Sequence, residues 1–247
     1  MDSDILLEGE QLDDLGRENF RLIQRRDRFR FGMDAVLLAA YARVHAGERV
    51  IDLGTGTGVI PILMRARYQC RSFTGLELDA VSADMALRSV RFNHLEDDIR
   101  IMCGDIREIR TLFEAGSFDA VTSNPPYMTV GSGAPPKDEP VAGARHEFFC
   151  TLEDVVKAAS YLLREQGRFY LVHRPMRLTQ IICTLVRYRL EPKRMQLVYP
   201  KRLGEPNLVL VECRKGGGPG LRMDPPLIVY GEDGEYTGQL LEIYYGE

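Results

Sequence analysis

Short apolar runs alternate with longer segments of helical periodicity along most of the chain. Runs that are apolar at nearly every position are typical of strands buried on both faces, and their alternation with helices indicates a parallel sheet covered on both sides. The expected strands are 49–54, 71–78, 99–105, 118–123, 168–175, 194–200 and 207–215. The expected helices between them are 58–68, 80–95, 151–166 and 177–188. The pattern predicts an α/β protein with a mostly parallel sheet.

Cap and turn residues refine two boundaries of this unit. Thr151, followed three residues later by Asp154, predicts a capped helix start, and Gly167 fits the position just after the helix end. Only residues 201–206 separate the last two strands. That connection leaves no room for a helix, so the last pair is expected to be antiparallel.

Segments of different character flank the unit. Residues 20–31 are expected to form a short Arg-rich hairpin that leads into a helix at 34–44. The run KGGGPG at 215–220 predicts a flexible break before an acidic, Tyr-rich tail. The chain is thereby divided into an N-terminal appendage at 1–45, a core at 46–215, and a tail at 216–247 that packs on or flanks the core.

Composition adds little to this picture but excludes several classes of protein. With 247 residues, 45% hydrophobic and 28% charged, the chain has the make-up of an ordinary soluble protein. The acidic start does not resemble a signal peptide, and the longest apolar run, near 35–42, is too short to cross a bilayer, so we expect a cytoplasmic protein without a membrane partner. The five cysteines are scattered and form no C-x-x-C, which predicts neither a disulfide framework nor a metal site.

The charge is unevenly distributed, although the net charge is only −4. Residues 17–30 hold six Arg against two acids, a local charge of +4, and residues 164–202 hold ten Lys or Arg against two Glu, a local charge of +8. If both segments share a face, that face could hold phosphate groups. A solvated Arg-rich surface explains the pattern equally well. The candidate RNA contacts are Arg25, Arg26, Arg28 and Arg30.

A glycine-rich loop, in VIDLGTGTGVI at 50–60, joins the first strand of the unit to its first helix. Glycines there allow a tight turn and the close approach of a ligand at the carboxyl edge of the sheet. The spacing is neither G-x-G-x-x-G nor G-x-x-x-x-G-K-[ST], so the loop alone is weak evidence, and a structural turn is the alternative. The candidate cofactor-binding residues here are Asp52, Gly54, Thr55, Gly56 and Gly58.

Acids at the ends of the next two strands strengthen this interpretation. Glu77, beside Leu78, can accept hydrogen bonds from both hydroxyls of a ribose. Asp105, beside Ile106, can accept one from an adenine amino group. Either acid alone is explained by helix capping or solvation, but together with the glycine loop the set predicts adenosine binding.

With these residues, the stretch 46–215 resembles the class I S-adenosylmethionine-dependent methyltransferases. The resemblance implies a Rossmann-like, seven-stranded, mostly parallel sheet whose last strand is antiparallel, with helices on both faces. It also implies S-adenosylmethionine as the cofactor. The glycine loop would hold its methionine part, Glu77 its ribose and Asp105 its adenine.

The fourth strand of the unit runs directly into Asn124, Pro125, Pro126 and Tyr127 at the same edge of the sheet. A planar nitrogen such as the exocyclic amine of adenine is a poor nucleophile, because its lone pair is delocalised. The Asn124 side-chain carbonyl and the Pro125 backbone carbonyl can accept its two hydrogens and draw it toward tetrahedral geometry, with the prolines holding both acceptors in place. Tyr127 can stack on the planar group, and no general base is needed. A turn with an aromatic plug is the structural alternative.

This N-P-P-Y motif is similar to that of amino-methyltransferases acting on adenine, on guanine and on glutamine side chains, so it predicts the reaction and not the substrate. The N-terminal segment resembles, more narrowly, the bacterial tRNA (adenine-N6)-methyltransferases that modify valine tRNA beside the anticodon. The matching residues are Gln24, Arg30, Phe31, Asp34, Ala35, Leu37, Leu38 and Ala39, and stretches 145–156 and 225–244 are also similar to that family. The resemblance implies methyl transfer to N6 of an anticodon-loop adenine, which needs little unstacking to enter a pocket.

Further expectations concern the residues around the site and the rival functions. Phe31 and Asp34 could close over the cofactor, although helix capping alone explains Asp34 as well. The long Gly/Pro loop at 127–147 is expected to gate the substrate, and His146 within it to be structural. The rival functions are a protein glutamine N5-methyltransferase, an rRNA amino-methyltransferase and a catalytically silent nucleotide- or RNA-binding module. The tRNA species and modified position stay open, and a monomer is favoured.

Overall fold

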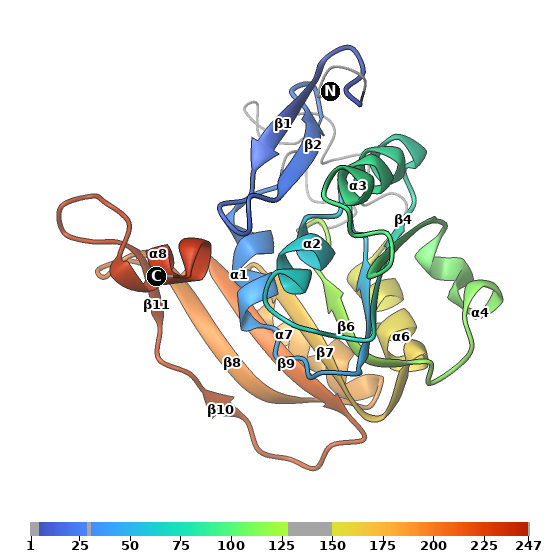
Figure 1. Ribbon diagram of the computed structural model, residues 1–247. Coiled ribbons are helices and arrows are strands. Elements are labelled where there is room, and N and C mark those ends of the chain that lie inside the picture. Colours follow the sequence, from blue (N-terminus) through green and yellow to red (C-terminus); the bar gives the residue numbers. More distant parts are fainter. Residues whose placement is uncertain (1–4, 29–30, 128–149, 247) are drawn as a thin grey trace.

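The computed structural model describes residues 5–28, 31–127 and 150–246 (Figure 1). Most strands of the described chain belong to one central sheet. These strands are β3 (Arg49–Leu53), β4 (Ser72–Glu77), β5 (Ile99–Cys103), β6 (Phe118–Ser123), β7 (Leu163–His173), β8 (Leu190–Lys201), β9 (Leu208–Lys215), β10 (Arg222–Met223) and β11 (Leu227–Tyr230). Their order is β10-β8-β9-β7-β6-β3-β4-β5, with β11 also paired to β8.

Strand directions agree with the expected architecture. β5, β4, β3, β6 and β7 are parallel to one another, and β9 lies antiparallel between β7 and β8. The α/β fold class and the antiparallel last pair are therefore confirmed. The sheet has nine strands instead of seven, because the C-terminal segment adds β10 and β11 alongside β8.

Helices cover both faces of the sheet (Figure 1). One face carries α1 (Met33–Tyr41), α2 (Val59–Arg65), α3 (Ala80–Phe92) and α8 (Gly238–Tyr245), and the other carries α4 (Ile109–Leu112), α6 (Leu152–Leu162) and α7 (Leu178–Arg187). Along β7, Tyr170 and Val172 are buried in the first cluster, whereas Phe169 and Leu171 are buried in the second. A strand that is apolar at every position is thus explained by burial on both faces.

The N-terminal hairpin lies earlier in the chain than expected. It pairs β1 (Glu10–Asp14) with β2 (Arg21–Arg25) in antiparallel register, so only its second strand falls within 20–31. The prediction of a hairpin contained in 20–31 is therefore wrong. The turn is made by residues in left-handed conformations, Gly16, Glu18 and Asn19, and two of these are not glycine. Rules for two-residue turns such as Asn-Gly do not find this turn, because residues 15–20 connect the two strands.

The boundary between α6 and β7 also differs from the expectation. The Thr151 and Asp154 capping box is present, but α6 ends at Leu162 and β7 begins at once, so Gly167 lies inside a strand and not at a helix end. A side chain at Gly167 would come within 2.9 Å of the Arg164 carbonyl oxygen. The glycine is required by close backbone approach within the sheet, not by a helix cap.

The C-terminal segment is joined to the rest of the molecule by polar contacts. The Arg194 guanidinium, buried on β8, forms ion pairs with Glu212 at 2.9 Å and with Asp224, beside β10, at 3.3 Å. Arg17 donates a hydrogen bond of 2.9 Å to the Glu242 carbonyl oxygen in α8. The end of the chain thereby contacts both the sheet and the segment that follows β1. Within the described ranges, no helix is both long enough and apolar enough to cross a membrane.

Candidate active site

The glycine loop follows the carboxyl end of β3 and ends where α2 begins. Gly54, Gly56 and Gly58 have φ angles of 73°, 56° and 88°, a region that favours glycine. The backbone N–H groups of Gly54 and Thr55 donate to the Leu76 carbonyl oxygen at 2.9 and 3.1 Å, which anchors the loop to β4. A Cβ atom added at Gly54 or Gly56 would meet no atom within 4 Å. The loop therefore borders open space into which a ligand can approach the backbone.

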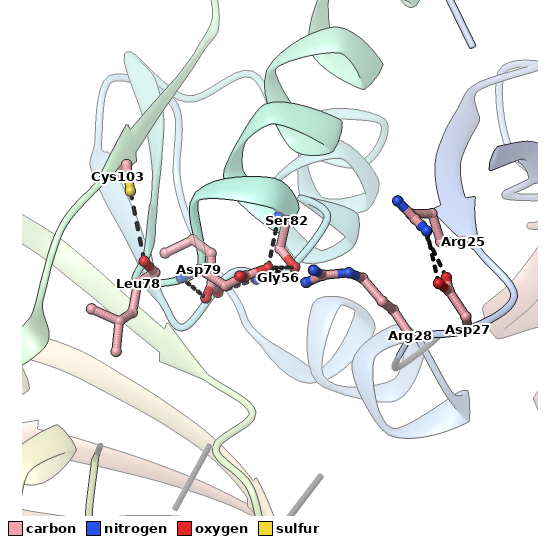
Figure 2. A network of polar contacts seen from close by, with 9 residues as sticks. Arg25, Asp27, Arg28, Gly56, Leu78, Asp79, Ser82 and Cys103 are labelled. Carbon is pink, nitrogen blue, oxygen red and sulfur yellow. Dashed lines mark hydrogen bonds and ion pairs between the residues drawn. The ribbon is translucent and has the colours of Figure 1, made fainter. Parts of the chain in front are cut away.

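Glu77, the last residue of β4, holds this loop, and Figure 2 shows Gly56 of the loop close to Asp79. One carboxylate oxygen accepts from the Gly56 N–H at 2.8 Å, and the other accepts from the Asp79 N–H at 2.9 Å. Asp79 in turn caps α3 and forms an ion pair with Arg28 at 2.7 Å. Each Glu77 oxygen keeps a further lone pair, so binding of ribose hydroxyls is compatible with this arrangement and stays a prediction.

Asp105 occupies the corresponding place after β5, where it begins the short helix η2 (Ile106–Glu108). Its carboxylate accepts from the Arg107 N–H at 2.8 Å and pairs with the Arg107 guanidinium at 2.5 Å, which lowers the pKa of Asp105 below its usual value. Leu78, between the two acids in sequence, is 38% exposed. Ile106 packs against the second core cluster. The adenine role of Asp105 stays a prediction.

Asp52 is buried beneath the loop with only part of its carboxylate satisfied. Its Oδ1 accepts from the Thr122 hydroxyl at 2.7 Å, whereas its Oδ2 has no hydrogen-bond partner within the described part of the chain. Burial raises the pKa of Asp52 to about 6, against the lowering effect of the nearby Thr122 and Thr55 hydroxyl groups. A buried carboxylate beneath the glycine loop fits a ligand that carries a donor, such as the amino group of S-adenosylmethionine.

The N-P-P-Y segment reaches the same edge of the sheet because β6 lies next to β3. The Ser123 hydroxyl donates to the Leu53 carbonyl oxygen at 2.8 Å, which fixes the last residue of β6 beside the glycine loop. Pro125 is buried, and Asn124, Pro126 and Tyr127 are half-buried. The residues expected to bind the cofactor and those expected to act on the amine therefore leave neighbouring strands side by side.

Tyr127 is surrounded by residues that the sequence did not single out. The His173 ring lies 5.1 Å from the Tyr127 ring, and the Arg174 guanidinium lies 4.9 Å from its centroid. Arg177 donates a hydrogen bond of 3.0 Å to the Tyr127 carbonyl oxygen. Burial lowers the pKa of His173 to about 4, so this ring is neutral. The only signal for these residues was their position at the end of an expected strand whose carboxyl end lies at the ligand-binding edge.

Asp34 and Phe31 reach this region from the N-terminal segment. Asp34 lies in the first turn of α1, where its Oδ1 accepts from the Ala35 N–H at 2.9 Å. Its Oδ2 lies 2.5 Å from the Tyr127 hydroxyl, a contact that helix capping does not explain. Phe31 packs against the first core cluster. Closure of these residues over a cofactor stays a prediction, and the loop beyond Tyr127, including His146, lies outside the described residues.

The candidate RNA-binding arginines are engaged with nearby groups. Arg25 pairs with Asp27 at 2.7 Å, Arg26 donates to Gln11 at 2.8 Å, and Arg28 pairs with Asp79. Arg30 lies outside the described residues.

The second basic segment does not form one surface. Arg168 and Arg194 take part in internal ion pairs. In contrast, Arg174, Arg177, Lys201 and Arg202 lie at or just beyond the carboxyl ends of β7 and β8. Only this last group shares the edge of the sheet that carries the candidate active site. The described ranges contain no group of three or more His, Cys, Asp or Glu residues that could hold a metal ion.

Comparisons with known proteins agree with this geometry. The family model for the methyltransferase small domain matches residues 32–188. The chain is 33% identical over 191 residues to a tRNA1(Val) (adenine(37)-N6)-methyltransferase of Porphyromonas gingivalis, covering 75% of this chain and 74% of the relative. It is 30% identical to the protein of the same name from Aeromonas salmonicida, covering 81% of this chain and 82% of the relative.

Solved structures show the fold. A predicted O-methyltransferase from Agrobacterium tumefaciens has a TM-score of 0.70 at 23% identity, covering 86% of this chain and 96% of that one. A geranyl diphosphate methyltransferase in complex with S-adenosylmethionine has a TM-score of 0.52 at 18% identity, covering 74% of this chain and 84% of that one. The chain belongs to the methyltransferase small domain family and has the fold of the class I methyltransferases.

Proposed function

We propose that this protein transfers a methyl group from S-adenosylmethionine to the exocyclic N6 amine of an adenine in tRNA, in the anticodon loop of a valine tRNA. The observation that carries this proposal is the convergence of Asn124 and Tyr127 with the glycine loop at one edge of the sheet. The names of the relatives, which specify adenine 37 of tRNA1(Val), support the choice of substrate.

The residues at the site are suited to a planar amine. S-adenosylmethionine, when bound, supplies an electrophilic methyl group. The Asn124 side-chain carbonyl and the Pro125 carbonyl are acceptors for the two amine hydrogens, and both stand on a backbone stiffened by proline. The Tyr127 ring offers a stacking surface for the base.

His173 is not suited to serve as a general base at this site. Its Nδ1 already accepts a hydrogen bond of 2.7 Å from the Arg174 N–H, and a neutral ring then carries its proton on Nε2. Proton loss from the methylated amine to solvent completes the reaction without a protein base.

Exposed cations and apolar side chains beside the site suit an RNA loop. Met176 and Leu203 are 91% and 92% exposed, in the connections that follow β7 and β8. Arg174 donates to the Asn207 carbonyl oxygen at 3.2 Å and so links these two connections. Cations can neutralise phosphates, and exposed apolar side chains can contact unstacked bases. This surface supports RNA as the substrate.

Methyl transfer to total tRNA, to DNA and to a release factor tests the proposal. We expect labelled methyl groups in tRNA, found by mass spectrometry as N6-methyladenosine in valine tRNA. Asn124→Ala should lower kcat about a hundredfold or more with little change in KM, because the lost acceptor acts mainly in the transition state. Label on a protein glutamine would keep the mechanism and overturn the substrate, whereas wild-type kcat in Asn124→Ala would contradict the acceptor role.

A further inference from the structure

The Tyr127 hydroxyl faces two acceptors with a single proton. Its oxygen lies 2.5 Å from Asp34 Oδ2 and 2.7 Å from the Asn124 side-chain atom placed as Oδ1. Burial and the nearby Asp34 charge raise the pKa of Tyr127 well above its usual value, so the hydroxyl stays protonated. One O–H group can donate fully to only one of these two partners.

The proton belongs on the side of the carboxylate. A charge-assisted hydrogen bond is roughly twice as strong as a neutral one, and the Asp34 contact is also the shorter of the two. Asn124 must then present its NH₂ group to the phenol oxygen. The oxygen and nitrogen of an amide exchange places by a half-turn of the side chain, which leaves the backbone unchanged.

We propose that Asp34 is a positioning residue that fixes the orientation of the Asn124 amide through the Tyr127 hydroxyl. Tyr127 donates to Asp34, and the Asn124 NH₂ group donates to Tyr127. The Asn124 carbonyl is thereby directed away from the tyrosine and is free to accept a hydrogen from the substrate amine. This inference rests on the proposed function for its chemical purpose but not for its geometry.

The arrangement explains why the N-terminal segment reaches the reaction loop. Asp34 and Tyr127 are 93 residues apart in sequence, yet the second oxygen of Asp34 is committed to the tyrosine while the first serves the Ala35 N–H. Without the hydroxyl, the amide can turn either way, and one of its two orientations directs an NH₂ group at the incoming amine. Tyr127→Phe should therefore lower kcat although the stacking ring is kept.

Asp34, Tyr127 and Asn124 form a hydrogen-bonded relay. Exchanging the carboxylate and the amide between its two ends, Asp34 and Asn124, tests the proposal. In Asn124→Asp two carboxylates face one hydroxyl, and we expect kcat at pH 8 to fall roughly a hundredfold, by analogy with the loss of one preorganised group. The double variant Asp34→Asn with Asn124→Asp restores one donor and one carboxylate. It should exceed the single variant Asn124→Asp about tenfold or more, a non-additivity expected only of residues that act as a unit.

The pH dependence of activity is a second measurement, and it would not change if Asp34 had only a structural role. Activity of Asn124→Asp should rise as the pH falls, since protonation of one carboxyl relieves the conflict, whereas the double variant should lack this rise. A double variant no better than Asn124→Asp, with the same pH profile, would overturn the proposal.

A measurement without substrate separates this inference from the proposed function. In protein labelled with 15N in asparagine, Tyr127→Phe and Asp34→Asn should each shift the Asn124 side-chain NH₂ signals, and the exposed control Asp97→Asn should not. If these shifts occur in a protein that methylates no RNA, the proposed function is contradicted and the relay is still supported. Methylation of tRNA together with unchanged Asn124 signals in both variants would support the proposed function and overturn the positioning role of Asp34.

Discussion

Asp52, which we predict to bind the cofactor, lowers the stability of the free protein when its carboxyl group is charged. Its carboxyl group is buried, one of its oxygens has no partner in the described part of the chain, and its pKa is raised to about 6 from 3.8. The folded protein therefore binds this proton more tightly than the unfolded chain. The stability that the neutral acid contributes is present below about pH 4 and is lost as the pH rises through about 6.

Removing this charge should stabilise the free protein at alkaline pH. The shift of the Asp52 pKa corresponds to about 3 kcal/mol in the free energy of unfolding at pH 8. We expect Asp52→Asn to raise Tm at pH 8, to lose that advantage near pH 4, and to weaken cofactor binding. Thermal unfolding at both pH values, with Asp97→Asn as the exposed control, measures this. A Tm difference independent of pH would show that Asp52 is not the titrating group.

At the scale of elements, we expect the connections at the carboxyl ends of the strands to decide what the site binds. The segment that follows β2 lies near the glycine loop, because Arg28 pairs with Asp79, whose N–H donates to the Glu77 carboxylate. Reversing the charge of Arg28 would therefore disturb the loop together with any RNA contact. The connection after β8 carries Arg202, which is exposed and is not part of the contacts around Tyr127.

Arg202→Glu should weaken tRNA binding without affecting the cofactor. We expect the slope of log affinity against log salt concentration to decrease by about 1, since one phosphate contact is lost. Arg214→Glu is the matched control, because Arg214 is exposed near the opposite end of the sheet, in register with Arg168 at the start of the paired part of β7. Equal effects of the two substitutions would contradict a binding surface at the carboxyl edge.

At the scale of the whole molecule, the C-terminal segment is part of the folded core. Leu227, Val229 and Leu240 are buried in the same cluster as the residues of α1. β11 continues the sheet beside β8, and Arg17 and Arg67 both donate to the carbonyl oxygens at the end of α8. Folding of the central sheet and of the tail should therefore be cooperative.

Leu240 and its neighbour Leu241 provide a matched test of this cooperativity. Leu240 is fully buried, and Leu240→Ala should lower the free energy of unfolding by about 2–5 kcal/mol. Leu241 is 41% exposed, and Leu241→Ala should change it by about 0.5 kcal/mol or less. Chemical denaturation followed by circular dichroism measures both. A separate early transition for the tail in Leu240→Ala would show that the tail folds on its own.

The order of the main strands and helices between residues 49 and 215 and the fold class were predictable from the sequence. Apolar periodicity, the length of connections and the placement of glycine and proline are local properties, and they persist whatever the rest of the chain does. Glu77, Asp105 and Asn124 could be placed at one edge because the carboxyl ends of parallel strands lie together.

Only the tertiary structure decided how these residues are connected. The contact between Asp34 and Tyr127, the stacking of Arg174 on Tyr127 and the ion pair between Arg28 and Asp79 join distant segments. No spacing rule encodes such contacts, because they depend on how α1, β6 and β7 pack. The strands β10 and β11 are too short to carry a pattern, and they exist because the edge of β8 offers unpaired backbone groups. Side-chain periodicity determines the helices and strands, whereas packing determines which side chains from distant segments contact one another.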